Sequence, residues 1–237
     1  MPMDIRAWLG RAQAGLQAAF GPRLRFLGLQ GSYGRGEARE GSDIDLVVIL
    51  DQVGAADWQT YRKVLSALPH ESLACGFFSG AAELAHWDRA DLFQFVHDTT
   101  PILGDLSALV PPIGRADAAR ALRRAACDLY HITGHNLLHA RSVEVLAGQF
   151  KAAAFALRAR HYVETGVFLR TAAELAAALS PEELAVLRGA QGLTADELDA
   201  RSLLLLDWAG RLIRENAPER PAPPGTAVRG AAPSEAT

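Results

Sequence analysis

Apolar and polar residues form repeating patterns along the first hundred residues that predict a mixture of helices and strands. At the beginning of the chain, Trp8, Ala12, Leu16 and Phe20 recur at helical spacing, and the pair Gly21-Pro22 ends that predicted helix. Short apolar runs after it, rich in β-branched residues, predict strands. The pattern predicts strands at Leu24–Gln30, Asp43–Leu50 and Ser72–Phe78, helices at Ala56–Leu68 and Ala81–Val96, and an edge strand at Ile102–Leu103.

The pattern changes after Pro111-Pro112, where strand-like runs give way to segments rich in Ala, Leu and Arg with helical period. Within this half, Ser180-Pro181 predicts the beginning of a helix, with the serine as N-cap and the proline in the first turn. Thr194 and Glu197 have the spacing of a capping box, which predicts the beginning of the last helix. We expect a first domain at residues 1–112, a bundle of about five helices at residues 115–216, and a disordered tail at residues 217–237.

Composition and charge narrow the class of protein further. The chain has 237 residues, of which 49% are hydrophobic and 22% charged, as is usual for globular proteins. Its net charge of −3 gives no basic surface for long nucleic acids. The two cysteines, Cys75 and Cys127, belong to no paired motif, which argues against a disulfide framework or a zinc knuckle. Because no apolar run reaches about 18 residues and the N-terminus lacks a signal-peptide pattern, we expect a cytoplasmic protein with no membrane partner.

Two carboxylates, Asp43 and Asp45, lie at the beginning of the second predicted strand, on either side of Ile44. Residues two apart on a strand share a face, so both carboxylates point the same way while Ile44 points into the core. Two carboxylates side by side repel each other unless a cation lies between them. Mg²⁺ suits such oxygen ligands, because it usually binds one or two carboxylates and completes its shell with water and substrate phosphate.

A glycine-rich stretch, Gly31-Ser32-Tyr33-Gly34-Arg35-Gly36, precedes the acidic pair. Gly31 allows the backbone to approach a phosphate closely, and N–H groups around Ser32 can donate to its oxygens. A phosphate-binding loop beside a metal-binding pair of aspartates indicates phosphoryl or nucleotidyl transfer.

The Gly31-Ser32 end of one strand, a ten-residue spacer and Asp43-Ile44-Asp45 at the beginning of the next resemble the core of polymerase-beta-type nucleotidyltransferases. Small members of that superfamily include antibiotic adenylyltransferases and the minimal nucleotidyltransferases. The resemblance implies an α+β fold, with a small mixed-sheet core followed by an all-α helical bundle and the active site between them. It also implies that Asp43 and Asp45 hold two Mg²⁺ ions, and that an acceptor hydroxyl attacks the α-phosphorus of an NTP, first of all ATP.

Members of the superfamily usually add a third carboxylate from the neighbouring strand, and here that residue is not obvious. The third predicted strand has no acid in its middle, so Glu71 at its beginning is the first candidate for a catalytic base. Glu83 and Asp91 are weaker candidates. A solvated residue at the strand entry is an equally good interpretation of Glu71. Arg35 lies close enough to Gly31 to bind phosphate oxygens, although a solvated loop arginine has the same pattern.

The second half offers further candidates for ligand contacts. Lys151 lies on an otherwise apolar helix, and by the family resemblance it would reach the triphosphate; a lysine with its stem on the helix surface is the structural alternative. His131 and His135, with His139, form a stripe along one helix, which we interpret as a surface for the substrate. Packing between helices is the alternative for the stripe, and it is favoured over metal binding.

Resemblance to drug-modifying enzymes favours a small hydroxyl-bearing acceptor. The main rival is transfer to a protein or a tRNA end, as in toxin–antitoxin systems. The missing acid in the third strand motivates a second rival, a nucleotide-binding module without catalysis.

Overall fold

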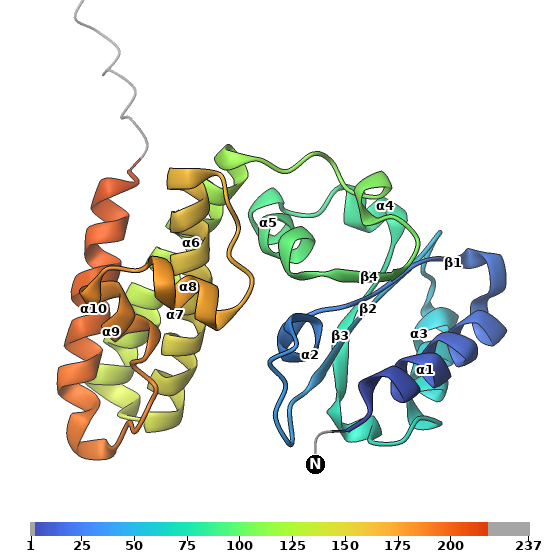
Figure 1. Cartoon of the computed structure of the whole chain (residues 1–237), viewed down its shortest axis with the longest axis horizontal. Coiled ribbons are helices and arrows are strands. Elements are labelled where there is room, and N and C mark those ends of the chain that lie inside the picture. The colour runs from blue at the N-terminus through green and yellow to red at the C-terminus, as the bar shows by residue number, and fades with distance from the viewer. Residues whose placement is uncertain (1–2, 218–237) are drawn as a thin grey trace, which may run out of the picture.

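The structure, a computed structural model, describes residues 3–217. Its two parts, a small sheet with helices and an all-helical part, lie side by side (Figure 1). The predicted tail lies, apart from its first residue, outside the described residues. The α+β fold class predicted from the sequence is confirmed.

A four-stranded mixed sheet forms the centre of the first part. Its strands are β1 (Leu24–Leu29), β2 (Ile44–Leu50), β3 (Ala74–Gly80) and β4 (Thr100–Leu103). They lie in the order β3-β2-β1-β4. β1 is antiparallel to both of its neighbours, whereas β2 and β3 are parallel. The amino ends of β2 and β3 therefore lie at the same edge of the sheet.

Helices cover both faces of this sheet because apolar residues of β2 alternate in direction. Leu46 and Val48 face a core formed with α1 and α3, whereas Val47 and Ile49 face the core beneath α4 and α5. The covering helices are α1 (Ile5–Phe20), α3 (Ala55–Ser66), α4 (Ala81–Ala85) and α5 (Arg89–Asp98). α1 contributes Trp8, whose indole N–H donates to the Pro69 carbonyl at 2.8 Å.

In the first part, one predicted helix and one predicted strand differ from the structure. The single helix predicted for Ala81–Val96 is wrong, because Asp88 accepts the N–H groups of Ala90 and Asp91 and so begins a separate helix. The third strand begins and ends two residues later than predicted, at Ala74–Gly80 instead of Ser72–Phe78, because Glu71–Leu73 form a 3-10 turn before it.

Five α-helices form the described part of the second half: α6 (Arg115–His135), α7 (Val143–Thr165), α8 (Ala172–Ala178), α9 (Pro181–Leu187) and α10 (Leu198–Glu215). Their core contains Leu122, Phe150, Leu205 and Trp208, all at most 1% exposed. Ser180 caps α9 as predicted, in a capping box with Glu183. The last helix begins at Leu198 rather than at Thr194, which instead precedes a 3-10 turn.

α5 belongs to both parts of the molecule. Leu92 packs against the sheet, and the next residue, Phe93, packs into the core of the helical bundle. Among residues 3–217, no helix combines the length and apolarity that crossing a membrane requires.

Candidate active site

Asp43 and Asp45 lie where the strand pattern predicts, at the amino end of β2, and Ile44 between them is fully buried. Asp43 is exposed and Asp45 is half-buried. Burial raises the pKa of Asp45, and the charges of Asp43 and Asp98 raise that pKa further, while Arg35 partly opposes them. The ionised pair is thus held in an unfavourable arrangement that a cation would relieve.

Gly31 packs directly against Asp45. Its φ of +64° lies in the left-handed region, and a Cβ at this position would lie 1.9 Å from Asp45 Oδ2. The preceding Gln30 donates its backbone N–H to the Asp45 carbonyl at 2.8 Å. Only glycine allows this approach, so the loop that begins at Gly31 is fixed beside the carboxylates.

The short helix α2 (Gly31–Arg35) follows, in the gap between the two parts of the molecule (Figure 1). The backbone N–H groups of Ser32 and Tyr33 in its first turn have no partner among the described hydrogen bonds. Unpaired N–H groups at the beginning of a helical turn suit an anion such as a phosphate.

Asp98, which the sequence did not single out, is a third acid at this site. It is 6% exposed, accepts the N–H of Gly31 at 3.3 Å and receives Arg35 Nη1 at 2.9 Å. Arg35 also donates from Nε to Glu37 at 2.9 Å. The guanidinium predicted to bind phosphate is therefore already paired with two carboxylates, and none of the described hydrogen bonds uses its Nη2.

The segment between α7 and α8 closes against this loop from the helical part. Arg170 Nη2 donates to the Asp98 carbonyl at 3.1 Å and to Thr100 Oγ1 at 2.8 Å. The backbone N–H of Ala172, the first residue of α8, donates to the Glu37 carboxylate. These bonds hold α2 between the sheet and the helical bundle.

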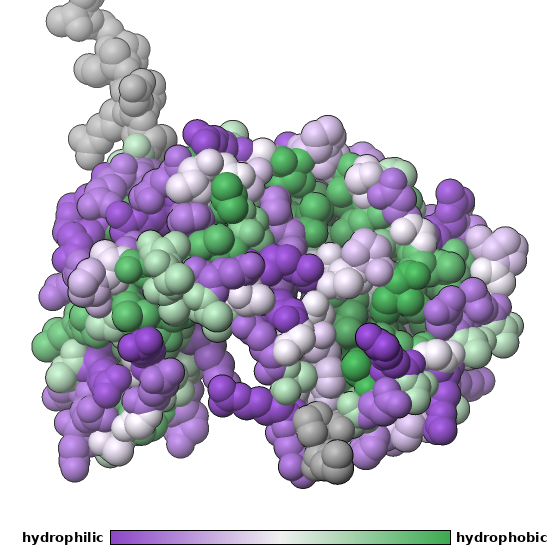
Figure 2. All heavy atoms as spheres, viewed as in Figure 1, coloured by the Kyte–Doolittle hydropathy of each residue, from purple (hydrophilic) through white to green (hydrophobic). Residues whose placement is uncertain are grey.

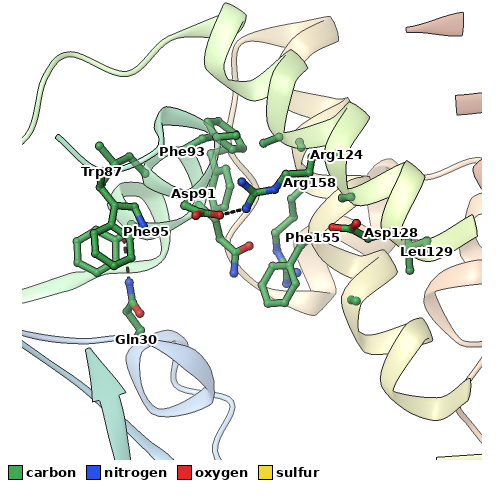
Figure 3. Close-up of a pocket in the computed structure, with 18 of the residues that line it drawn as sticks. Gln30, Trp87, Asp91, Phe93, Phe95, Arg124, Asp128, Leu129, Phe155 and Arg158 are labelled. Carbon is green, nitrogen blue, oxygen red and sulfur yellow. Dashed lines mark hydrogen bonds and ion pairs between the residues drawn. The ribbon is translucent and has the colours of Figure 1, made fainter. Parts of the chain in front are cut away.

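A cavity of about 610 Å³ lies next to this loop, between α5 on one side and α6 and α7 on the other (Figure 3). Gln30 and Arg158 are among its lining residues, whereas Gly31, Ser32, Asp43 and Asp45 are not. Figure 2 shows the surface hollowed between the two parts, with hydrophilic side chains along the rim of the hollow.

Other predicted site residues lie at varying distance from this arrangement. Glu71 is exposed in the turn before β3, at the same edge of the sheet as Asp43, and it is not among the charges that act on Asp45. On β3, the register partner of Asp45 is Cys75, so that strand contributes no carboxylate opposite the pair. The sequence already indicated this lack of a carboxylate, because the third predicted strand has no acid in its middle.

Lys151, His131 and His135 are all exposed on the helical part and do not line the cavity. The imidazole rings of His135 and His139 lie 4.8 Å apart. The faces of α6 and α7 that line the cavity carry other residues, among them Asp128 and Phe155.

The carboxylates fit a Mg²⁺ site that is completed by a ligand. Within the described part of the chain, no three His, Cys, Asp or Glu side chains gather into a metal site of their own. Asp43 and Asp45 supply two carboxylates beside a loop with unpaired N–H groups, and Mg²⁺ typically binds one or two carboxylates together with water and substrate phosphates.

Comparison with known proteins agrees with this geometry. Residues 21–73 match a family model described as "Nucleotidyltransferase domain". Among solved structures, spectinomycin adenyltransferase AAD(9) from Enterococcus faecialis, crystallised with ATP and spectinomycin, is similar in fold, with a TM-score of 0.58 and 14% sequence identity over 88% of this chain and 99% of that chain. No curated protein matches the chain in sequence.

Proposed function

We propose that this protein transfers AMP from ATP to a hydroxyl of a small-molecule acceptor, because residues 21–73 match a family model described as "Nucleotidyltransferase domain". The observation that carries the proposal is the packing of Gly31 on Asp45, which joins a phosphate-binding loop to a pair of carboxylates. The choice of ATP and of a small acceptor is supported by the fold shared with AAD(9), whose crystals contained ATP and spectinomycin.

In the proposed reaction, the N–H groups of Ser32 and Tyr33 hold the β- and γ-phosphates at the first turn of α2. The acceptor oxygen forms a bond to the α-phosphorus, the bond from that phosphorus to the bridging oxygen of the β-phosphate breaks, and pyrophosphate leaves. Asp43 and Asp45 would hold Mg²⁺. When bound, this ion neutralises charge on the phosphates and favours deprotonation of the acceptor hydroxyl.

Glu71 is our candidate to receive the proton of the acceptor hydroxyl. Since β2 and β3 are parallel and Ile44 pairs with Ala74, Glu71 lies near the same sheet edge as Asp43. An exposed carboxylate there can exchange the proton with solvent after each turnover. Asp98 is less suited to this role, because Gly31 and Arg35 already bind its oxygens.

Arg35 and Lys151 complete the proposed nucleotide site. Arg35 would offer its remaining Nη2 donor to a phosphate oxygen while Asp98 and Glu37 hold the guanidinium in place. Lys151 is exposed on α7 and would reach the triphosphate only from the solvent side. His131 and His135 would contribute to acceptor binding only beyond the cavity, since they do not line it.

Transfer of labelled AMP from [α-³²P]ATP, with pyrophosphate release, tests the proposal. We expect both to require Mg²⁺ and an acceptor, and to be lost in Asp43→Asn. Transfer of label to a protein or tRNA, but to no small molecule, would favour the macromolecular rival.

The lack of a carboxylate on β3 opposite Asp45 supports one other candidate function, a nucleotide-binding module without catalysis. Calorimetry separates the two functions. ATP binding that depends on Asp45, with no pyrophosphate release across a panel of acceptors, would support the binding module and contradict the transferase.

A further inference from the structure

The cavity between α5 and the helical bundle begins beside the reacting groups. Phe77 on β3 lines it and is the register partner of Val47, which lies two residues after Asp45 and on the same face of β2. Gln30, the residue before Gly31, lines it as well. A ligand in the cavity can therefore present a group to the Asp45 end of the sheet.

Aromatic side chains, among them Phe77, Trp87 and Phe95, line the cavity near the sheet (Figure 3). The rings of Phe77 and Trp87 meet edge to face with centroids 5.1 Å apart, and Phe77 meets Phe95 at 4.9 Å. Trp87 is 41% exposed, so part of its ring is available to a ligand. Phe155 and Phe168 contribute from the helical part. Such walls favour ring systems with apolar faces.

Two carboxylates and two guanidinium groups line the cavity, and most of them already have ion-pair or hydrogen-bond partners within the protein. Asp91 is already paired with Arg124, which also bonds Asp88. Arg158 is 6% exposed and donates to the backbone carbonyls of Ala154, Leu169 and Arg170. Of the described carboxylates that line the cavity, Asp128 alone has no ion pair or hydrogen bond. A polycationic ligand would need several such carboxylates.

We propose that this cavity is the acceptor site of the proposed transferase, and that it takes a largely apolar, ring-containing alcohol or phenol with at most one charged group. The role of the ligand as an acceptor rests on the proposed function. The ligand class rests on the aromatic wall and on the balanced charges. A nucleobase in the cavity is the competing occupant. We favour the acceptor over the nucleobase because of the strand order. The cavity wall next to Asp45 comes from β3, on one side of β2, whereas β1, the strand that leads to Gly31 and the proposed phosphate site, lies on the other side of β2.

Calorimetry with two probes tests the ligand class on the full chain. 2-Naphthol is a neutral fused-ring alcohol, and kanamycin is a polycationic aminocyclitol. We expect 2-naphthol to bind and kanamycin not to bind.

Ala152→Trp fills the cavity and should weaken 2-naphthol binding by at least about tenfold. Trp87→Ala removes one wall at an exposed position and should weaken it without affecting folding. The matched control Ala177→Trp, exposed on α8 and outside the cavity, should bind like the unmodified protein.

A saturating ATP analogue that cannot be cleaved between the α- and β-phosphates, together with Mg²⁺, should leave the affinity for 2-naphthol unchanged. Competition between ATP and 2-naphthol would assign the cavity to the nucleobase and overturn the proposal. The absence of 2-naphthol binding, equal binding by Ala152→Trp and Trp87→Ala, or kanamycin binding that Ala152→Trp abolishes would overturn it too. A protein that binds 2-naphthol in the cavity but transfers no AMP to any acceptor would contradict the proposed function and leave the ligand class supported.

Discussion

Asp45, a proposed Mg²⁺ ligand, carries a charge that costs the folded protein stability. Because burial and the charges of Asp43 and Asp98 raise its pKa, the folded protein binds the Asp45 proton more tightly than the unfolded chain does. The free energy of unfolding therefore falls as pH rises from about 3.9, the ordinary value for aspartate, through the raised pKa of Asp45.

We predict that Asp45→Asn melts at a higher temperature than the unmodified protein at pH 7, without Mg²⁺. The difference should disappear as the pH falls below about 4, where the carboxyl is protonated in both states. Transfer should fall by more than about a hundredfold, since even residues that only orient metal ligands contribute about 10- to 100-fold. Calorimetric melting across pH 3–8, with turnover measured alongside, checks both expectations.

Asp207→Asn is the matched control, because Asp207 is exposed on α10 and has no ion pair among the described residues. It should change neither quantity. An Asp45→Asn protein that melts earlier at pH 7, or keeps its turnover, would contradict the assignment of this site.

Glu71 gives a second prediction for a single residue. If it receives the acceptor proton, Glu71→Gln should lower turnover by about 10²- to 10⁴-fold, the usual contribution of a general base. The melting temperature should not change, because Glu71 is exposed in the turn before β3. Steady-state kinetics of this variant beside Glu83→Gln would show which of the two carboxylates matters. An unaffected Glu71→Gln would assign the proton to another group.

At this scale the sequence predicts groups that follow from one local pattern. Asp43 and Asp45 share a face because strand alternation requires it, and Gly31 has a left-handed φ that glycine adopts without a steric cost. Asp98 could not be found in the same way. Its role depends on the end of α5 meeting the beginning of α2, which are 67 residues apart in the chain.

The loop from β1 to β2 is the element on which the site depends, and its glycines can be compared with each other. Gly31 and Gly36 both have positive φ, +64° and +73°, but only at Gly31 would a Cβ meet a neighbouring atom, Asp45 Oδ2. Substitution by alanine should cost about 1–3 kcal/mol of backbone strain at either position.

We predict that Gly31→Ala abolishes transfer, whereas Gly36→Ala loses only the stability that backbone strain costs and keeps most of its activity. Urea unfolding gives the two losses of stability, and ATP calorimetry with turnover gives the functional split. Equal loss of activity in both variants would mean that general strain in the loop, and not the contact with Asp45, limits the reaction.

Elements with strong local signals were predictable, and those that depend on neighbours were less so. α1 occupies Ile5–Phe20, where the helical spacing and Gly21-Pro22 place it. The break between α4 and α5 was missed because apolar spacing continues across it, while the cap at Asp88 interrupts the backbone. Likewise, the apolar run around β3 does not reveal that its first residues form a 3-10 turn.

For the whole molecule, the change in composition after Pro111-Pro112 predicts a sheet part and a helical part, but not how they join. α5 places Leu92 in one core and Phe93 in the other, a contact that no local pattern encodes. The same holds for Arg170, which reaches Asp98 and Thr100 across the junction. The histidine stripe was visible in the sequence, but which face of α6 lines the cavity depends on this junction.

Glu37 links the two parts through a titratable contact. Burial alone would raise the pKa of Glu37, but the N–H of Ala172 and the guanidinium of Arg35 outweigh it and hold the pKa below its usual range. The stabilisation from this contact is therefore fully present above about pH 4.3, the ordinary value for glutamate. It is lost as the pH falls through the lowered pKa of folded Glu37.

We predict that the Ala172 amide proton, followed by NMR, shifts with a midpoint below about 4.3, and that the free energy of unfolding falls across the same interval. In Glu37→Gln that midpoint should vanish and the fall in stability should become shallower, because the side-chain amide of the introduced glutamine does not gain a proton in this pH interval. Glu182→Gln, whose carboxylate pairs with Arg211 within the helical part, controls for the loss of an ion pair elsewhere. If the Ala172 amide titrates identically in Glu37→Gln, the carboxylate of Glu37 does not join the two parts in solution.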